Sequence, residues 1–66
     1  MANDSDAEKI EAYKQAIKIN PDFANAYFGL GAVYVFSNDR ASALEQYKIL
    51  KNLDPERANK LFNMIL

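Results

Sequence analysis

The sequence predicts an all-α fold of about four helices, arranged as an antiparallel helix-turn-helix repeat. Apolar residues recur at helical spacing in four segments, and residues typical of helix ends separate these segments. No stretch shows the sustained alternation or the Asn-Gly or Asp-Gly turn that is typical of β-hairpins. Half of the 66 residues are hydrophobic, enough for one small core, so residues 1–66 are expected to form a single domain.

The first helix is predicted at about residues 6–19. Ser5 and Glu8 in "SDAE" have the spacing of a capping box at its start. Ile10, Tyr13 and Ile17 then fall on one face of the helix. The helix is expected to end at Asn20.

The second helix is predicted to start almost where the first one ends. In "NPD", Asn20 is a suitable N-cap, Pro21 suits the first helical position and Asp22 suits the first turn. The helix continues through "NAYFGLGAVYVF", which has no charge but contains two glycines. Glycine costs about 1 kcal/mol relative to alanine inside a helix, so these two positions need a reason.

The third and fourth helices each follow an acidic cap. "SND" at 37–39 caps a helix that runs to about Leu53. Asp54 followed by Pro55 then starts a last helix at about residues 55–66.

The chain repeats itself with an offset of 34 residues, the separation of its two prolines, Pro21 and Pro55. "EAYK" at Glu11 returns as "EQYK" at Glu45. Three further identities share this offset: Ala24 with Ala58, Asn25 with Asn59 and Phe28 with Phe62.

In this pattern the chain resembles the tetratricopeptide repeat family. The family has a large aromatic residue, leucine, glycine and tyrosine in a first helix, then a small residue, an aromatic residue and proline around a second. The matching residues are Tyr27, Leu30, Gly31, Tyr34, Ala43, Tyr47 and Pro55. The resemblance implies a short right-handed superhelical stack with one complete repeat at 24–57, preceded by the second helix of an earlier repeat and followed by a first-type or capping helix. Leu50 and Lys9 depart from the pattern, since both stand where the family has a small residue.

The helical spacing suggests a purpose for one glycine. Tyr27, Leu30, Gly31 and Tyr34 share one face, so we expect Gly31 to lie against Ala43 of the next helix and to permit close backbone approach. Gly29 lies off that face. It is either tolerated beneath crowded aromatic side chains or leaves room for the backbone of a partner.

The resemblance also implies a concave groove that binds a protein or peptide. Its predicted partner-binding residues are Asn25, Phe28, Ala32, Val35, Phe36, Asn59 and Phe62. Ala32 and Val35 could instead pack on the first and fourth helices, and the two asparagines could simply be solvated near helix starts. The predicted positions carry no lysine or arginine to clamp a carboxylate, so an apolar or amphipathic peptide or helix is the expected partner.

Composition argues against other functions. The chain has no cysteine or histidine, and no nucleophile with a positioned base, so neither an enzyme nor a catalytic residue is expected. The acids in "DSDAE" resemble part of a calcium loop, but Lys9 and Gln15 replace its glycine and glutamate, so no metal or other cofactor is expected. A net charge of −1 without a basic stripe argues against nucleic acid, and no small-molecule substrate is expected. With no leader or membrane-spanning run, we expect a cytoplasmic location.

The last helix raises the alternative of self-association. Repeat arrays usually need about three repeats to bury a continuous core, and this chain has fewer. A homodimer could cover the apolar end of the chain, "LFNMIL"; its candidate residues are Leu61, Met64, Ile65 and Leu66. The chain could equally be a fragment of a longer array or a recruitment appendage of a larger enzyme.

Overall fold

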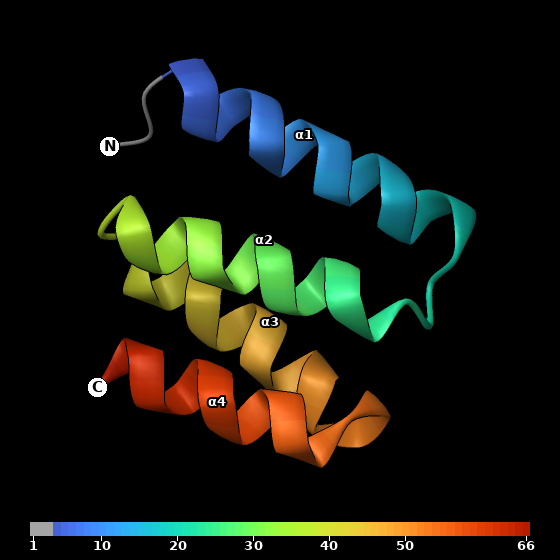
Figure 1. Cartoon of the computed structure of the whole chain (residues 1–66), viewed down its shortest axis with the longest axis vertical. Coiled ribbons are helices and arrows are strands. Elements are labelled where there is room, and N and C mark those ends of the chain that lie inside the picture. Colours follow the sequence, from blue (N-terminus) through green and yellow to red (C-terminus); the bar gives the residue numbers. More distant parts are fainter. Residues whose placement is uncertain (1–3) are drawn as a thin grey trace.

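The computed structural model describes residues 4–66, which fold into four helices with no strand in that range. These are α1 (Asp4–Ile19), α2 (Ala24–Phe36), α3 (Arg40–Leu53) and α4 (Pro55–Ile65). Successive helices run antiparallel, and α3 crosses behind α2 and α4 in Figure 1. The all-α helix-turn-helix prediction is confirmed.

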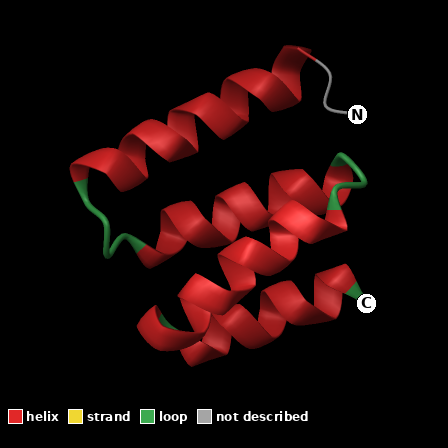
Figure 2. Ribbon diagram, turned by 180° about the vertical axis from the view of Figure 1, so that it is seen from behind, coloured by secondary structure: helices red, strands yellow, loops and turns green. Residues whose placement is uncertain are grey.

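The helices pack mainly on their neighbours in the chain. Contacts join α1 to α2, α2 to α3 and α3 to α4, and one longer-range pairing joins α2 to α4. Helix α1 therefore lies at one edge, where α2 is the only helix it contacts. Figure 2 shows the same order from behind, with α3 in front of α2 and α4.

The main core lies between α2, α3 and α4. Its buried members are Tyr27, Ala43, Leu50, Ala58, Leu61 and Ile65. Leu50, which replaces the family's small residue, is completely buried and so adds volume to this core. The other signature residues Leu30 and Gly31 are buried, whereas Tyr34 and Tyr47 are half-buried and Pro55 is exposed.

The predicted caps of the last two helices are confirmed. Asp39 accepts a hydrogen bond from the backbone N–H of Ser42 (3.2 Å) at the start of α3. Hydrogen bonds from the hydroxyl and the backbone N–H of Ser42 hold the pKa of Asp39 below its usual value. Asp54 caps α4 through the backbone N–H of Arg57 (3.2 Å), and Pro55 is the first residue of that helix.

The predicted caps of the first two helices were wrong. Helix α1 begins at Asp4, so Ser5 lies inside the helix and does not cap it. Helix α2 begins at Ala24, three residues after Pro21. Residues 20–23 form a turn instead, in which the backbone N–H of Phe23 donates to the Asn20 carbonyl (3.1 Å) and that of Asp22 to the Asn20 side chain (3.3 Å). This turn uses the side-chain oxygen that would have capped α2.

The two glycines face two different neighbours. A Cβ atom added to Gly31 would lie 2.6 Å from Leu61 Cδ2, and its three nearest atoms all belong to Leu61 of α4. The nearest side chain to Gly31 is therefore that of Leu61, where Ala43 had been expected. A Cβ atom at Gly29 would collide with the ring of Tyr13 from α1, so this glycine does lie beneath an aromatic side chain.

Candidate partner-binding site

Helix α2 is apolar on three sides, and each side has its own surroundings. The stripe that contains Gly29 also contains the buried residues Ala26 and Val33, and it faces α1 through Tyr13. A second stripe, with Tyr27 and Gly31, faces the core shared with α3 and α4. The third stripe contains Phe36, the most exposed large apolar side chain of α2, so it is the candidate site.

This third stripe contains Asn25, Phe28, Ala32 and Phe36, spaced at i, i+3, i+7 and i+11. Asn25 and Phe36 are exposed at its two ends, and Phe36 keeps 77% of its surface in solvent. Phe28 and Ala32 between them are half-buried. The stripe is thus a mostly apolar, partly exposed surface with a largely exposed aromatic ring at one end.

Phe28 also packs against the core, as does the neighbouring residue Val35. Both remain half-buried, so part of each side chain still faces solvent. Truncation of either residue would therefore affect the fold as well as the surface. Phe36 does not have this double role.

Helix α4 contributes the two remaining predicted residues, Asn59 and Phe62, both exposed. The ring of Phe62 packs on Tyr47 of α3, with centroids 5.1 Å apart and an interplanar angle of 35°. Lys51 Nζ lies 5.7 Å from the centroid of the Tyr47 ring. The α3 contact holds Phe62 in a fixed place before any partner arrives, which lowers the cost of ordering it on binding.

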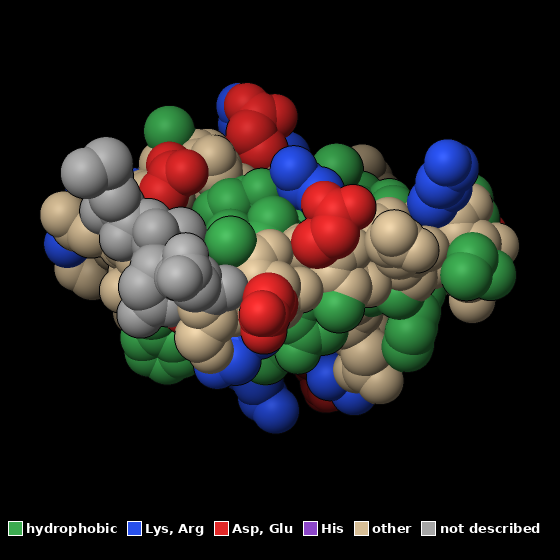
Figure 3. Space-filling model, turned by 90° about the horizontal axis from the view of Figure 1, so that it is seen from above, with side chains coloured by type: hydrophobic (Ala, Val, Ile, Leu, Met, Phe, Trp, Pro, Cys, Tyr) green, Lys and Arg blue, Asp and Glu red, His purple; other side chains and the backbone are tan. Residues whose placement is uncertain are grey.

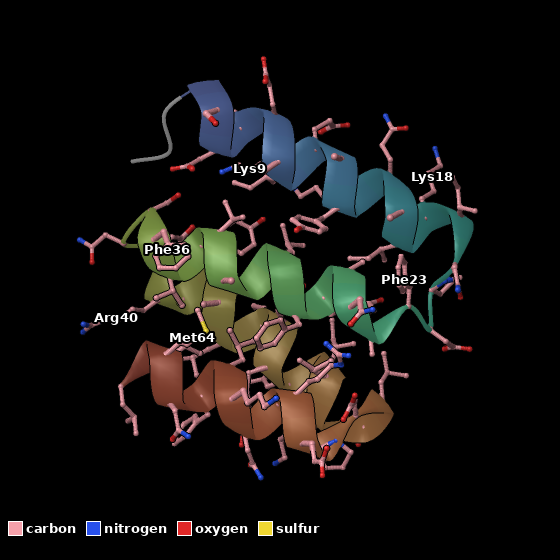
Figure 4. The ribbon with its side chains drawn as sticks, in the orientation of Figure 1. Lys9, Lys18, Phe23, Phe36, Arg40 and Met64 are labelled. Atoms are coloured by element: carbon pink, nitrogen blue, oxygen red, sulfur yellow. The ribbon has the colours of Figure 1, made fainter. Side chains whose placement is uncertain are left out.

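The predicted self-association residues divide into two pairs. Leu61 and Ile65 are buried in the core at 0% and 7% exposure, so they present no surface to a second copy. Met64 is half-buried and Leu66 is 81% exposed. Figure 4 shows Met64 at the same end of the domain as Phe36, on the facing helix.

Three other exposed apolar residues were not predicted from the sequence. Ile19 (85%) and Phe23 (39%) flank the turn between α1 and α2, and Ile49 (41%) lies on α3. The helical spacing could have indicated two of them, because Ile19 lies opposite the apolar face of α1 and Ile49 lies off the buried face of α3. Phe23 was expected to lie inside α2. Only the later start of α2 leaves Phe23 outside the helix.

The seven candidate residues include no ionisable group, so they can offer apolar contact and amide hydrogen bonds but no charge. Figure 3, which looks onto the α1 side, shows acidic and basic side chains interspersed among hydrophobic ones there. Within residues 5–66, no three acidic side chains are grouped so that they could hold a metal ion. None of the helices described here has the length and apolar character needed to cross a membrane.

Part of the chain is similar to a known family. Residues 7–35, which cover most of α1 and α2, match a family model described as "TPR repeat". Comparisons with curated proteins and with solved structures found no significant match.

Proposed function

We propose that this chain, which carries a tetratricopeptide repeat, binds an apolar or amphipathic peptide or helix on the third stripe of α2 and the adjoining residues of α4. Tetratricopeptide repeats generally act as protein–protein interaction modules and are typically non-catalytic. The proposal adds to this general role a particular surface and a class of partner.

The exposure of Phe36 is the observation that carries the proposal. Burying a phenylalanine side chain stabilises a fold or a complex by about 1.5–3 kcal/mol. Because Phe36 is mostly exposed, most of this stabilisation is still available for binding a partner. It is aligned with Phe28 and Ala32 on a surface without charge. Exposed aromatic residues of this kind are common anchors at protein interfaces.

The dimensions of the stripe suit a short partner segment. Asn25 and Phe36 are eleven residues apart on one helix, which corresponds to about 16 Å. An amphipathic helix of about three turns, or an extended peptide of about five residues, covers that length. Because the stripe lacks charge, we expect binding to depend little on salt.

A fluorescence anisotropy titration tests the proposal with a designed probe. The probe is a labelled 12-residue amphipathic helical peptide with a leucine face and an otherwise neutral surface. We expect Phe36→Ser to weaken its binding about tenfold, which corresponds to about 1.4 kcal/mol. Circular dichroism checks that helicity is unchanged.

Ile49→Ser is the matched control, since it removes an exposed apolar side chain of α3 that lies outside the proposed surface. This variant should bind the peptide as the parent chain does. Equal losses in the two variants would mean that the peptide binds any exposed apolar residue, and the proposed surface would be wrong.

A second candidate function is self-assembly through the C-terminal end of α4. The exposure of Leu66, together with the half-buried Met64, favours it. Sedimentation equilibrium over a wide concentration range tests it: Leu66→Ser should shift a dimer towards monomer. An unchanged association constant would remove Leu66 from the interface.

A further inference from the structure

Helix α1 is the least firmly held element of the domain. It contacts α2 and no other helix. None of residues 5–19 is buried, whereas the shorter helix α4 buries Ala58, Leu61 and Ile65. The hydrophobic contribution to its attachment is therefore smaller than that of α4.

Two specific contacts position α1 on the rest of the domain. The ring of Tyr13 occupies the space over Gly29 of α2. At the other end of α2, the hydroxyl of the buried residue Ser37 donates a hydrogen bond to Asp6 Oδ2 (3.0 Å). Both contacts join α1 to α2 or its C-cap, so the α1 helix of any copy of this chain could make them.

The junction after α1 is also less firmly fixed than the other two. Asp39 and Asp54 cap α3 and α4 with side-chain hydrogen bonds, whereas Phe23 at the start of α2 has no side-chain cap. The exposed apolar side chains of Ile19 and Phe23 flank this junction. Opening the turn at residues 20–23 breaks few hydrogen bonds. The exposed side chains of Ile19 and Phe23 are then available for new contacts.

We propose that α1 is an exchangeable helix and that two copies form a dimer in which α1 of each copy lies on α2 of the other. Tyr13 of one copy then fills the space over Gly29 of its partner, and Asp6 accepts from the partner's Ser37. Every contact of α1 is retained, which makes such exchange a low-cost route to a dimer. The two opened junctions lie close to each other, where Ile19 and Phe23 become buried.

The exchanged dimer differs from a dimer formed through the end of α4. It uses the α1–α2 interface and leaves the third stripe of α2 uncovered in both copies. A single assembly then presents two such stripes, which would strengthen binding to a partner that carries two matching segments.

The absence of cysteine from the chain allows a direct crosslinking test. Asp6→Cys and Ser37→Cys are combined in the full chain, because their side chains already touch. The reduced protein is equilibrated at low micromolar and at millimolar concentration, then oxidised and run on a non-reducing denaturing gel. Exchange joins the two cysteines between copies, so the covalent dimer should become the main product at the higher concentration.

The controls are the two single variants, Asp6→Cys and Ser37→Cys. Each carries one cysteine, so it cannot form crosslinked monomer, and its covalent dimer should stay a minor product at both concentrations. Crosslinked monomer alone from the Asp6/Ser37 pair at every concentration would overturn the proposal. Covalent dimer in equal share from the single variants would overturn it as well, since it would reflect random collision.

A measurement on the unsubstituted chain covers the case in which a cysteine variant does not fold or crosslink. Isotope-labelled and unlabelled copies are mixed at millimolar concentration, and NMR detects magnetisation transfer between the Tyr13 ring of one copy and the Gly29 α-protons of the other. Transfer between copies supports exchange. Transfer confined to single copies contradicts it.

Discussion

Leu61 of α4 fills the space that Gly31 leaves open on α2. Both residues are buried, and a Cβ atom at Gly31 would lie 2.6 Å from Leu61 Cδ2 and 2.9 Å from Leu61 Cδ1. Glycine inside a helix costs about 1 kcal/mol relative to alanine. The close packing of α2 on α4 must offset that cost.

Gly31→Ala should therefore destabilise the domain. Leu61 is completely buried, so its side chain cannot move aside without disturbing the core. Overpacking of this kind costs about 1–3 kcal/mol, more than alanine gains by its helix propensity. Urea unfolding followed by circular dichroism measures the change, and an unfolding free energy equal to that of the parent chain would refute the prediction.

Gly29→Ala should be much milder. The added methyl group meets the far end of the Tyr13 side chain, which is half-buried at the edge of the domain and can swing outwards. The gain in helix propensity, about 1 kcal/mol, then roughly offsets the lost contact. The same urea experiment should place this variant within about 1 kcal/mol of the parent chain; a loss as large as that of Gly31→Ala would show that Tyr13 is rigidly held.

Asp54→Ala should destabilise α4 by about 0.5–2 kcal/mol, the usual effect of losing an N-cap. The Asp54 carboxylate accepts from the backbone N–H of Arg57 and also pairs with Arg57 Nε at 3.0 Å. Asp54→Asn separates the two interactions, because it keeps the cap but removes a partly exposed ion pair that contributes at most about 1 kcal/mol. Thermal unfolding should rank the parent chain first, Asn second and Ala last.

Acid should weaken the domain partly through Asp39. The folded state lowers the pKa of this carboxyl from its usual 3.8, chiefly through hydrogen bonds from Ser42. The unfolded state therefore binds a proton more readily, so this stabilisation is complete above pH 3.8 and is lost as the pH falls through the lower folded pKa.

Asp39→Asn removes this titration while an amide oxygen still caps α3. Unfolding free energies of the two proteins, measured from neutral pH down to about pH 2, should converge as the carboxyl of the parent chain becomes protonated. A difference that does not change with pH would rule out a role for Asp39 ionisation.

A capping residue in the sequence predicts a helix start only where the residues after it can donate hydrogen bonds to its side chain. "NPD" and "DPE" look equivalent, yet the first forms a turn and the second caps a helix. The Asp54 side chain accepts hydrogen bonds from both the backbone N–H and the guanidinium of Arg57, three residues later. The residue at the same distance from Asn20 is Phe23, whose side chain has no group to donate.

Periodicity likewise predicts which residues of α2 share a face but not which helix that face meets. The alignment of Asn25, Phe28, Ala32 and Phe36 could be derived from spacing alone. The burial of each of these side chains could not be derived in this way, because it depends on how α3 and α4 pack on α2. For the same reason Ala43 was expected to be the neighbour of Gly31, although Leu61 is the side chain nearest to this glycine.

The order in which the helices pack has a consequence for folding speed. Apart from the α2–α4 pairing, every helix contact joins elements that are adjacent in the chain. Chains dominated by such short-range contacts close small loops on the way to the native state and fold in about microseconds to milliseconds. Because all the other helices contact α2, we expect their docking on this helix, and not the formation of any single helix, to limit the rate.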